Sequence, residues 1–304
     1  MLTVALGLGS ALLLGTADFL GGLASKKISS IRATAIVGTV GLIAMLALYP
    51  FAGGVWSTEA VVFGALSGFA GAGAIVLLYA CLAIGPMSIL SPLTAVVSAI
   101  VPMTVGLTRG EQLHPVGYVA LGLALLAVIL VGFVRDPAAT KPSARALLMA
   151  TASGVLIGLF LIFMDLTPPE SNIVPLIVNR AANASLMFTL IAVIALAGIQ
   201  RNRRMPTSTE HPDPSTMVVD THSRRPWMSG LRLAVIAGLV DATANTVLLL
   251  SLRLGDLTVI SVLSAMYSAG TIILAAIFLR EKLTPTQIAG LVLALGAAAL
   301  LALA

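Results

Sequence analysis

The chain has 304 residues, of which 59% are hydrophobic and only 10% are charged, and its mean hydropathy is +1.07. So few polar residues cannot cover the surface of a water-soluble globular protein, which excludes that class. Cys81, which lies in an apolar stretch, is the single cysteine, so the chain cannot form an intramolecular disulfide.

The apolar residues occur in stretches of about 20 residues, the length that an α-helix needs to cross a bilayer. The expected spans are 2–22, 31–52, 60–83, 87–107, 113–134, 145–165, 173–198, 229–251, 256–279 and 285–304. We therefore expect an all-α integral membrane protein with ten transmembrane helices. No small-residue cleavage pattern follows the first span, so we expect it to stay in the protein rather than act as a signal peptide.

The net charge of +5 is distributed unevenly over the loops. Almost all Lys and Arg residues fall in the loops after spans 1, 5, 7 and 9, and the opposite side offers only Arg109 and Arg253. The positive-inside rule then places the basic loops in the cytoplasm and both termini outside, in a multi-pass protein of the cell (inner) membrane. Because topology explains the charge, a nucleic-acid partner is not expected.

Residues 200–228 form the one long connection, rich in Pro, Ser, Thr and charge. We expect a flexible cytoplasmic linker there. His211 and His222 lie in it, but their spacing fits no metal site, and neither a metal nor another cofactor is expected.

The chain contains an internal repeat. Residues 85–130 and 255–300 align without a gap at an offset of 170, with 15 identical residues in 46 positions. The match extends back through the third and eighth spans, and more weakly to the first and sixth through Ser10/Ser153 and Gly15/Gly158.

Each copy holds five spans, in residues 1–134 and 145–304. An odd number of crossings inserts the second copy upside down, so we expect two inverted-topology five-helix repeats. That architecture is typical of secondary transporters, whose site lies near the midplane between the halves. A duplicated scaffold or receptor is the alternative.

Three charged residues lie within the spans: Asp18, Arg180 and Asp241. Charge there is costly, which makes each a functional candidate. Asn245 follows Asp241 by one turn and shares its face. We expect Arg180 to meet an anionic group, and Asp18 or Asp241 to bind a cationic group or a coupling proton. The alternative is a purely structural pair of Arg180 with either aspartate.

Further candidates are polar or helix-breaking residues of the third, fourth and ninth spans. Tyr79 and Tyr267 suit a small-molecule pocket, although a Tyr at the membrane interface is the alternative for Tyr79. The serine rows that include Ser91 and Ser261 either line a polar cavity or bond neighbouring helices. The predicted points of helix interruption and gating are Pro92, Pro102 and Gly270.

Two other motifs have simpler roles. Gly64 and Gly68 predict close approach of the third span to a neighbour. Glu111 and Glu281 precede the fifth and tenth spans, where negative charge at a helix N-terminus predicts capping.

The repeated motif also carries a family resemblance. It appears as GPMSILSPLTAVVSAIVP…RGEQLHP and as GDLTVISVLSAMYSAG…LREKLTP. This pattern resembles the EamA-type repeat of the drug/metabolite transporter superfamily, most clearly in residues 60–134 and 230–304. The resemblance implies a ten-helix bundle with a central cavity, alternating access and efflux of amino acids or other small metabolites in exchange for protons.

From the repeat and the resemblance together, we expect a secondary active transporter rather than an enzyme. Its expected partners are a small-molecule substrate, the lipid bilayer and a candidate coupling proton, and it would act as a monomer or homodimer. An intramembrane enzyme with an Asp18–Asp241 dyad and a passive channel are the alternatives from other classes.

Overall fold

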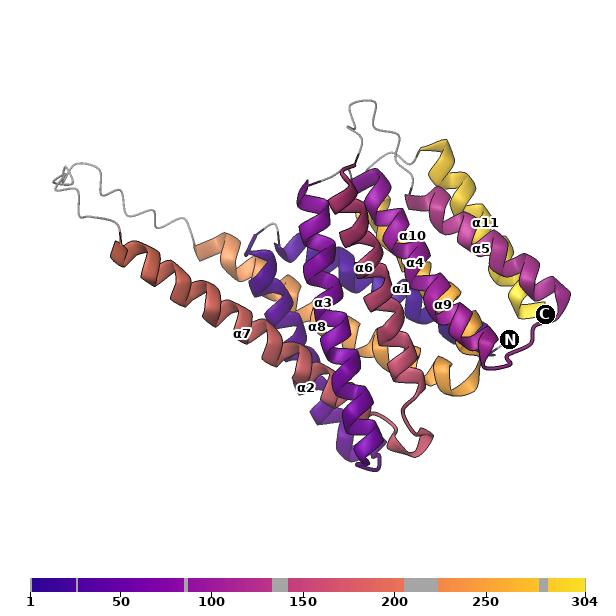
Figure 1. The fold of residues 1–304 in the computed structure, drawn as a ribbon, viewed down its shortest axis with the longest axis horizontal. Coiled ribbons are helices and arrows are strands. Elements are labelled where there is room, and N and C mark those ends of the chain that lie inside the picture. Colours follow the sequence, from indigo (N-terminus) through magenta and orange to yellow (C-terminus); the bar gives the residue numbers. More distant parts are fainter. Residues whose placement is uncertain are drawn as a thin grey trace.

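The computed structural model describes residues 2–25, 27–84, 87–132, 142–204, 224–278 and 284–303. Every regular element in these ranges is helical (Figure 1). The elements are α1 (Leu2–Ser25), α2 (Ser30–Ala52), α3 (Thr58–Ile84), α4 (Met87–Thr108), α5 (Pro115–Gly132), α6 (Ala144–Asp165), the 3₁₀ turn η1 (Pro169–Ser171), α7 (Val174–Arg204), α8 (Arg224–Leu254), α9 (Leu257–Ala265), α10 (Tyr267–Phe278) and α11 (Pro285–Leu303). The expected all-helical class is confirmed for the described residues.

Seven helices are long and apolar enough to cross a membrane by length and composition. They correspond to spans 1, 2, 3, 6, 7, 8 and 9 of the sequence, the last as α9 and α10 together. Three shorter apolar helices, Leu93–Thr108, Pro115–Val131 and Pro285–Leu301, lie where spans 4, 5 and 10 were expected. The count of ten crossings therefore stays a prediction.

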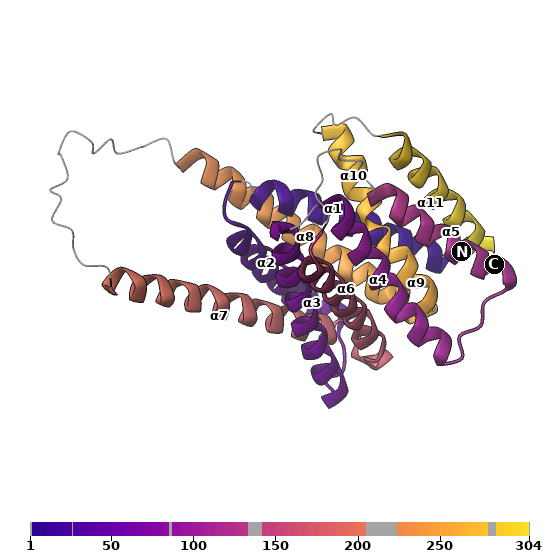
Figure 2. The same cartoon turned by 45° about the horizontal axis from the view of Figure 1, so that its top comes forward.

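Helices far apart in the sequence pack side by side. α1 packs along α8, and α3 packs along α6. α2 packs on both α7 and α8, while α4 packs on α6 and α9. α5 and α11 form a pair at one edge of the bundle (Figures 1 and 2). The C-terminal part of α7 and the first turns of α8 project from the opposite edge in both views.

The predicted linker is shorter than expected. α7 continues to Arg204 and α8 begins at Arg224, so the ends of the 200–228 segment are helical. The rest of that segment, with His211 and His222, lies outside the described residues.

Gly64 and Gly68 bring α3 against α7, as predicted. A Cβ atom at Gly64 would lie 2.8 Å from the carbonyl oxygen of Pro175, and one at Gly68 would lie 2.5 Å from that of Asn179. Those oxygens belong to the α7 backbone, so they cannot move aside without separating the helices. Small residues are what permit such close helix packing in membranes.

Gly68→Ala is expected to destabilise the protein by about 1–3 kcal/mol, because the added methyl group overpacks the α3–α7 contact. Gly71→Ala on the same helix is the matched control, since its Cβ would meet only Phe160 at 3.9 Å. The measurement is the thermal unfolding midpoint in detergent. Equal midpoints for the two variants would contradict the proposed steric cause.

Candidate functional site

An ion pair lies in the middle of the bundle. Nη2 of Arg180 on α7 is 2.6 Å from Oδ2 of Asp241 on α8. Only 10% of the Arg180 side chain and 17% of the Asp241 side chain are exposed. Of the pairings considered from the sequence, the structure therefore contains Arg180 with Asp241.

Asn245 holds the second oxygen of this carboxylate. Its Nδ2 donates to Oδ1 of Asp241 at 3.1 Å and to the Asp241 carbonyl oxygen at 2.8 Å. The two side chains do lie on one face of α8, one turn apart. Oδ1 of Asp241 thus accepts a hydrogen bond, whereas Oδ2 is paired with Arg180 by charge and accepts no hydrogen bond from the described residues.

The Arg180 side chain lies against α2. A Cβ at Gly41 would be 3.5 Å from its Cδ and Nε, and a Cβ at Gly38 would be 3.7 Å from Oδ1 of Asn183. These two glycines leave room for the polar side chains of α7. Nε of Arg180 is buried and has no hydrogen-bond partner in the described part of the chain. One edge of the guanidinium therefore remains available as a donor.

Asp18 lies on α1, within electrostatic reach of Asp241. Its side chain is exposed in the bundle. It has no ion-pair or hydrogen-bond partner among the described residues. We call Asp18, Arg180, Asp241 and Asn245 the central cluster.

Some of the other predicted site residues have side chains outside the described part of the structure. The side chains of Tyr79, Ser91 and Pro92 are not described. Ser261 is fully buried and its hydroxyl donates to the Thr258 carbonyl of its own helix at 2.9 Å. Tyr267 is half-buried at the first position of α10.

The predicted interruption of the ninth span is present, but not at Gly270. α9 ends at Ala265 and α10 begins at Tyr267, whereas Gly270 lies inside α10, where a Cβ would be 3.4 Å from Cα of Leu12 on α1. Gly270 thus serves close packing rather than interruption. α4 is continuous through Pro102, which packs on Gly158 of α6.

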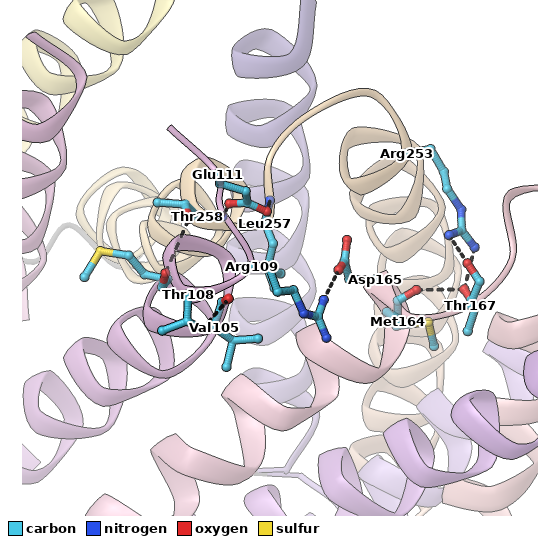
Figure 3. Close-up of polar contacts among 11 residues, drawn as sticks. Val105, Thr108, Arg109, Glu111, Met164, Asp165, Thr167, Arg253, Leu257 and Thr258 are labelled. Atoms are coloured by element: carbon cyan, nitrogen blue, oxygen red, sulfur yellow. Dashed lines mark hydrogen bonds and ion pairs between the residues drawn. The ribbon is translucent and has the colours of Figure 1, made fainter. Parts of the chain in front are cut away.

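A second group of polar contacts lies at one end of the bundle (Figure 3). Nη1 of Arg109, just after α4, donates to Oδ2 of Asp165 at the end of α6 at 2.9 Å. Arg253, near the end of α8, donates from Nη1 and Nη2 to the carbonyl and hydroxyl oxygens of Thr167. Glu111, near Arg109, contacts the start of α9 in the same view. We call Arg109, Glu111, Asp165, Thr167 and Arg253 the end network.

Glu111 is a helix cap, as predicted, but of a different helix. Its Oε1 and Oε2 accept from the backbone N–H groups of Leu257 and Thr258 at 3.0 and 2.9 Å. It therefore caps α9 rather than the α5 helix that follows it in the sequence. A Cβ at Gly106 would collide with the side chains of Glu111 and Thr258, so the glycine on α4 leaves room for this contact. Glu281, its counterpart in the repeat, lies outside the described residues.

Asp256 precedes α9 beside this carboxylate. Partial burial, and then the negative charge of Glu111, raise the pKa of its carboxyl above the usual range. Asp256 makes no side-chain hydrogen bond to the helix it precedes. The capping of α9 thus depends on Glu111, which comes from the other half of the chain.

Most of the end network was not predicted from the sequence. The sequence marks Arg109 and Arg253 only as the two basic residues of the loops on the less basic side of the membrane. The signal that could have pointed to Arg109 and Asp165 is that each charged group directly follows or ends an apolar span. Their pairing across 56 positions is a tertiary contact without a sequence signature.

Other sites offer less. A groove of about 610 Å³ lies between Leu123 of α5 and Leu293 of α11, and its lining is almost wholly apolar. It has too few polar groups to orient a polar substrate. No group of three or more His, Cys, Asp or Glu residues suited to a metal ion occurs within the described ranges.

Comparisons with known proteins identify a family and a similar fold. The model of a family described as the EamA-like transporter family matches residues 144–303, more than half of the chain. No curated protein matches. A solved structure, described as the crystal structure of a protein, is 17% identical with a TM-score of 0.68, over 99% of this chain and 98% of the other. At that identity the likeness concerns the fold alone.

Arg180→Ala is expected to destabilise the protein by about 3–5 kcal/mol, because it leaves the Asp241 carboxylate buried without its ionic partner. The control is the double variant Arg180→Leu/Asp241→Leu, which removes both charges and should unfold at a higher temperature than the single variant. Thermal unfolding in detergent measures both. A double variant no more stable than the single one would contradict the pairing argument.

Glu111→Ala is expected to cost about 0.5–2 kcal/mol, since two N–H groups at the start of α9 lose their acceptor. Glu111→Gln keeps one acceptor oxygen and should lose less. Hydrogen exchange of the first turn of α9 provides a local measurement. Unchanged exchange there in Glu111→Ala would rule out the capping role.

Proposed function

The chain belongs to the EamA-like transporter family and is a multi-pass membrane protein, and we propose that it is a secondary active exporter of a small polar metabolite, an amino acid or a similar compound. It works by alternating access and is coupled to protons. It resides in the cytoplasmic membrane, with its basic loops in the cytoplasm and both termini outside. The observation that carries the proposal is the central cluster, a set of charged groups within an apolar bundle of this family.

The proposed architecture is two inverted five-helix repeats, in residues 1–134 and 145–304. Helix packing supports it, because the contacts occur in equivalent pairs. If α1, α2 and α3 correspond to α6, α7 and α8, then the α1–α8 contact matches α6–α3, and α2–α8 matches α7–α3. The α2–α7, α4–α9 and α5–α11 contacts each join an element to its own counterpart.

Glycine contacts follow the same correspondence. A Cβ at Gly15 of α1 would lie 2.8 Å from the backbone nitrogen of Thr271, and one at Gly158 of α6 would lie 2.9 Å from Cβ of Val101. Gly15 aligns with Gly158, and Val101 aligns with Thr271 at the offset of 170. The same packing solution therefore occurs in both proposed halves.

The roles within the central cluster follow from its partners. Asp241 neutralises Arg180, and Asn245 holds Asp241 in place. Asp18 has no such partner among the described residues, so we assign it the cationic group of the substrate or the coupling proton. The free Nε of Arg180 is the donor for an anionic group of the substrate.

Tyr79, Tyr267, Ser91 and Ser261 remain proposed contributors to the substrate pathway, and Pro92 and Pro102 remain proposed gating positions. An aspartyl-dyad enzyme is disfavoured by the same contacts. Arg180 and Asn245 already occupy both oxygens of Asp241, whereas a catalytic dyad has two carboxylates that share one proton. The family's function as transporters also weighs against an enzyme.

The test uses purified protein in liposomes. Asp18→Asn and Asp241→Asn should each be assayed for pH-driven transport and for exchange of labelled substrate against unlabelled substrate. The variant at the coupling residue is expected to lose the first and keep the second, because only the first needs a titrating carboxyl. Unchanged pH-driven transport in both variants would rule out the coupling role.

The substrate for this assay would come from a thermal-shift screen of metabolites, since a ligand that binds the native state raises the unfolding midpoint. Arg180→Lys serves as a control for carboxylate binding, because it keeps the charge but lacks the planar guanidinium edge. Chemical conversion of the substrate during counterflow would favour the enzyme alternative.

A further inference from the structure

Several contacts at the end of the bundle that carries the end network cross between the two proposed halves. The Arg109–Asp165 ion pair joins α4 to α6, and Glu111 joins the same turn to the start of α9. At the same end, Oγ1 of Thr3 on α1 donates to the carbonyl oxygen of Leu254 on α8 at 3.2 Å. Each contact links a residue before position 134 to one after position 145.

Two of the helices joined here, α1 and α8, carry Asp18 and Asp241 of the central cluster. Both contact α9, which in turn packs on α4. For a path to open from Asp18 to the water at this end, the two halves must separate. The ion pair and the Glu111 contacts would have to break in that movement.

The opposite end has weaker connections among the described residues. Nζ of Lys27 lies 3.2 Å from Oγ of Ser229, and the guanidinium of Arg32 lies 5.8 Å from the ring centre of Trp227. Neither contact joins opposite charges. Both ion pairs of the described chain lie elsewhere, one in the central cluster and one in the end network.

The two residues of this ion pair do not recur at the aligned positions of the repeat. At the offset of 170, Arg109 aligns with Leu279. At the offset of 143, which aligns Ser10 with Ser153, Asp165 aligns with Gly22. An ion pair that is made only while this end of the bundle is closed stabilises the closed conformation of this end.

We propose that Arg109 and Asp165 form a gate, which keeps the resting transporter closed at the end network. The proposal rests on the proposed transport function and topology, under which the opposite end faces the cytoplasm. Arg109 and Asp165 act on the conformational equilibrium and do not contact the substrate.

The expected shift in the conformational equilibrium follows from the exposure of the two side chains. The side chains are 39% and 22% exposed, so the pair is of the partly solvated kind whose loss shifts an equilibrium by about two- to fivefold. A change of that size would not abolish transport. The test therefore has to measure the gate itself.

The experiment measures the distance between spin labels by electron paramagnetic resonance, in lipid nanodiscs without substrate. Cys81→Ala removes the one native cysteine, and labels at Thr108→Cys and Glu170→Cys, both exposed, report the separation of α4 from the α6–α7 connection. Arg109→Gln and Asp165→Asn are each expected to raise the fraction of long distances about two- to fivefold. Arg109→Lys, which keeps the charge, should stay near the parent protein.

The matched control is Arg32→Gln, which removes one arginine at the opposite end and should leave these distances unchanged. The gate would be overturned if neither Arg109→Gln nor Asp165→Asn changes the distances, or if Arg109→Lys changes them as much as Arg109→Gln. The readout needs no transport, so a failed liposome assay would reject the proposed function while leaving this result to stand.

Discussion

The contact between Arg180 and Asp241 is the constraint on which the middle of this bundle depends. A charged side chain at the centre of a membrane helix costs about 2.5–3.5 kcal/mol on insertion scales. Two opposite charges that meet there offset much of this cost, so α7 and α8 must present these residues to each other at the same depth. Asn245 then sets the orientation of the carboxylate, and the glycines of α2 leave the space that the guanidinium needs.

That pairing also determines which charge remains for function. Arg180 and Asp241 compensate each other, whereas Asp18 lies near Asp241 without a cation of its own among the described residues. The three side chains together carry one uncompensated negative charge when all are ionised. Such a site favours a proton or a ligand with a positive group, which is why the proposed coupling role centres on Asp18. The free Nε of Arg180 can still orient an anionic group within the same ligand.

Much of the fold could be predicted from the sequence, because the signals are local. The span boundaries depend on runs of apolar residues, and Asn245 shares a face with Asp241 through helix periodicity. The partner of Arg180 stayed open between two aspartates, since a sequence does not say which helices meet. For the same reason, the sequence does not show that Glu111 caps α9 or that Arg109 pairs with Asp165. Gly270 was wrongly expected to interrupt the ninth span, because a glycine that serves helix packing looks the same in a sequence.

The two proposed halves share packing positions but not the charged residues of the central cluster. Gly68 and Gly238, which align in the repeat, both contact backbone of a neighbouring helix, Asn179 on α7 and Val37 on α2. In contrast, Asp241 aligns with Gly71, whose added Cβ would meet only the ring of Phe160. Equivalent packing allows two conformations of similar energy, since each half can take the arrangement of the other. Polar groups without a counterpart in the other half can then make the free energies of the two conformations unequal. The central cluster does so through the ligand that it binds, and Arg109 and Asp165 do so through their ion pair.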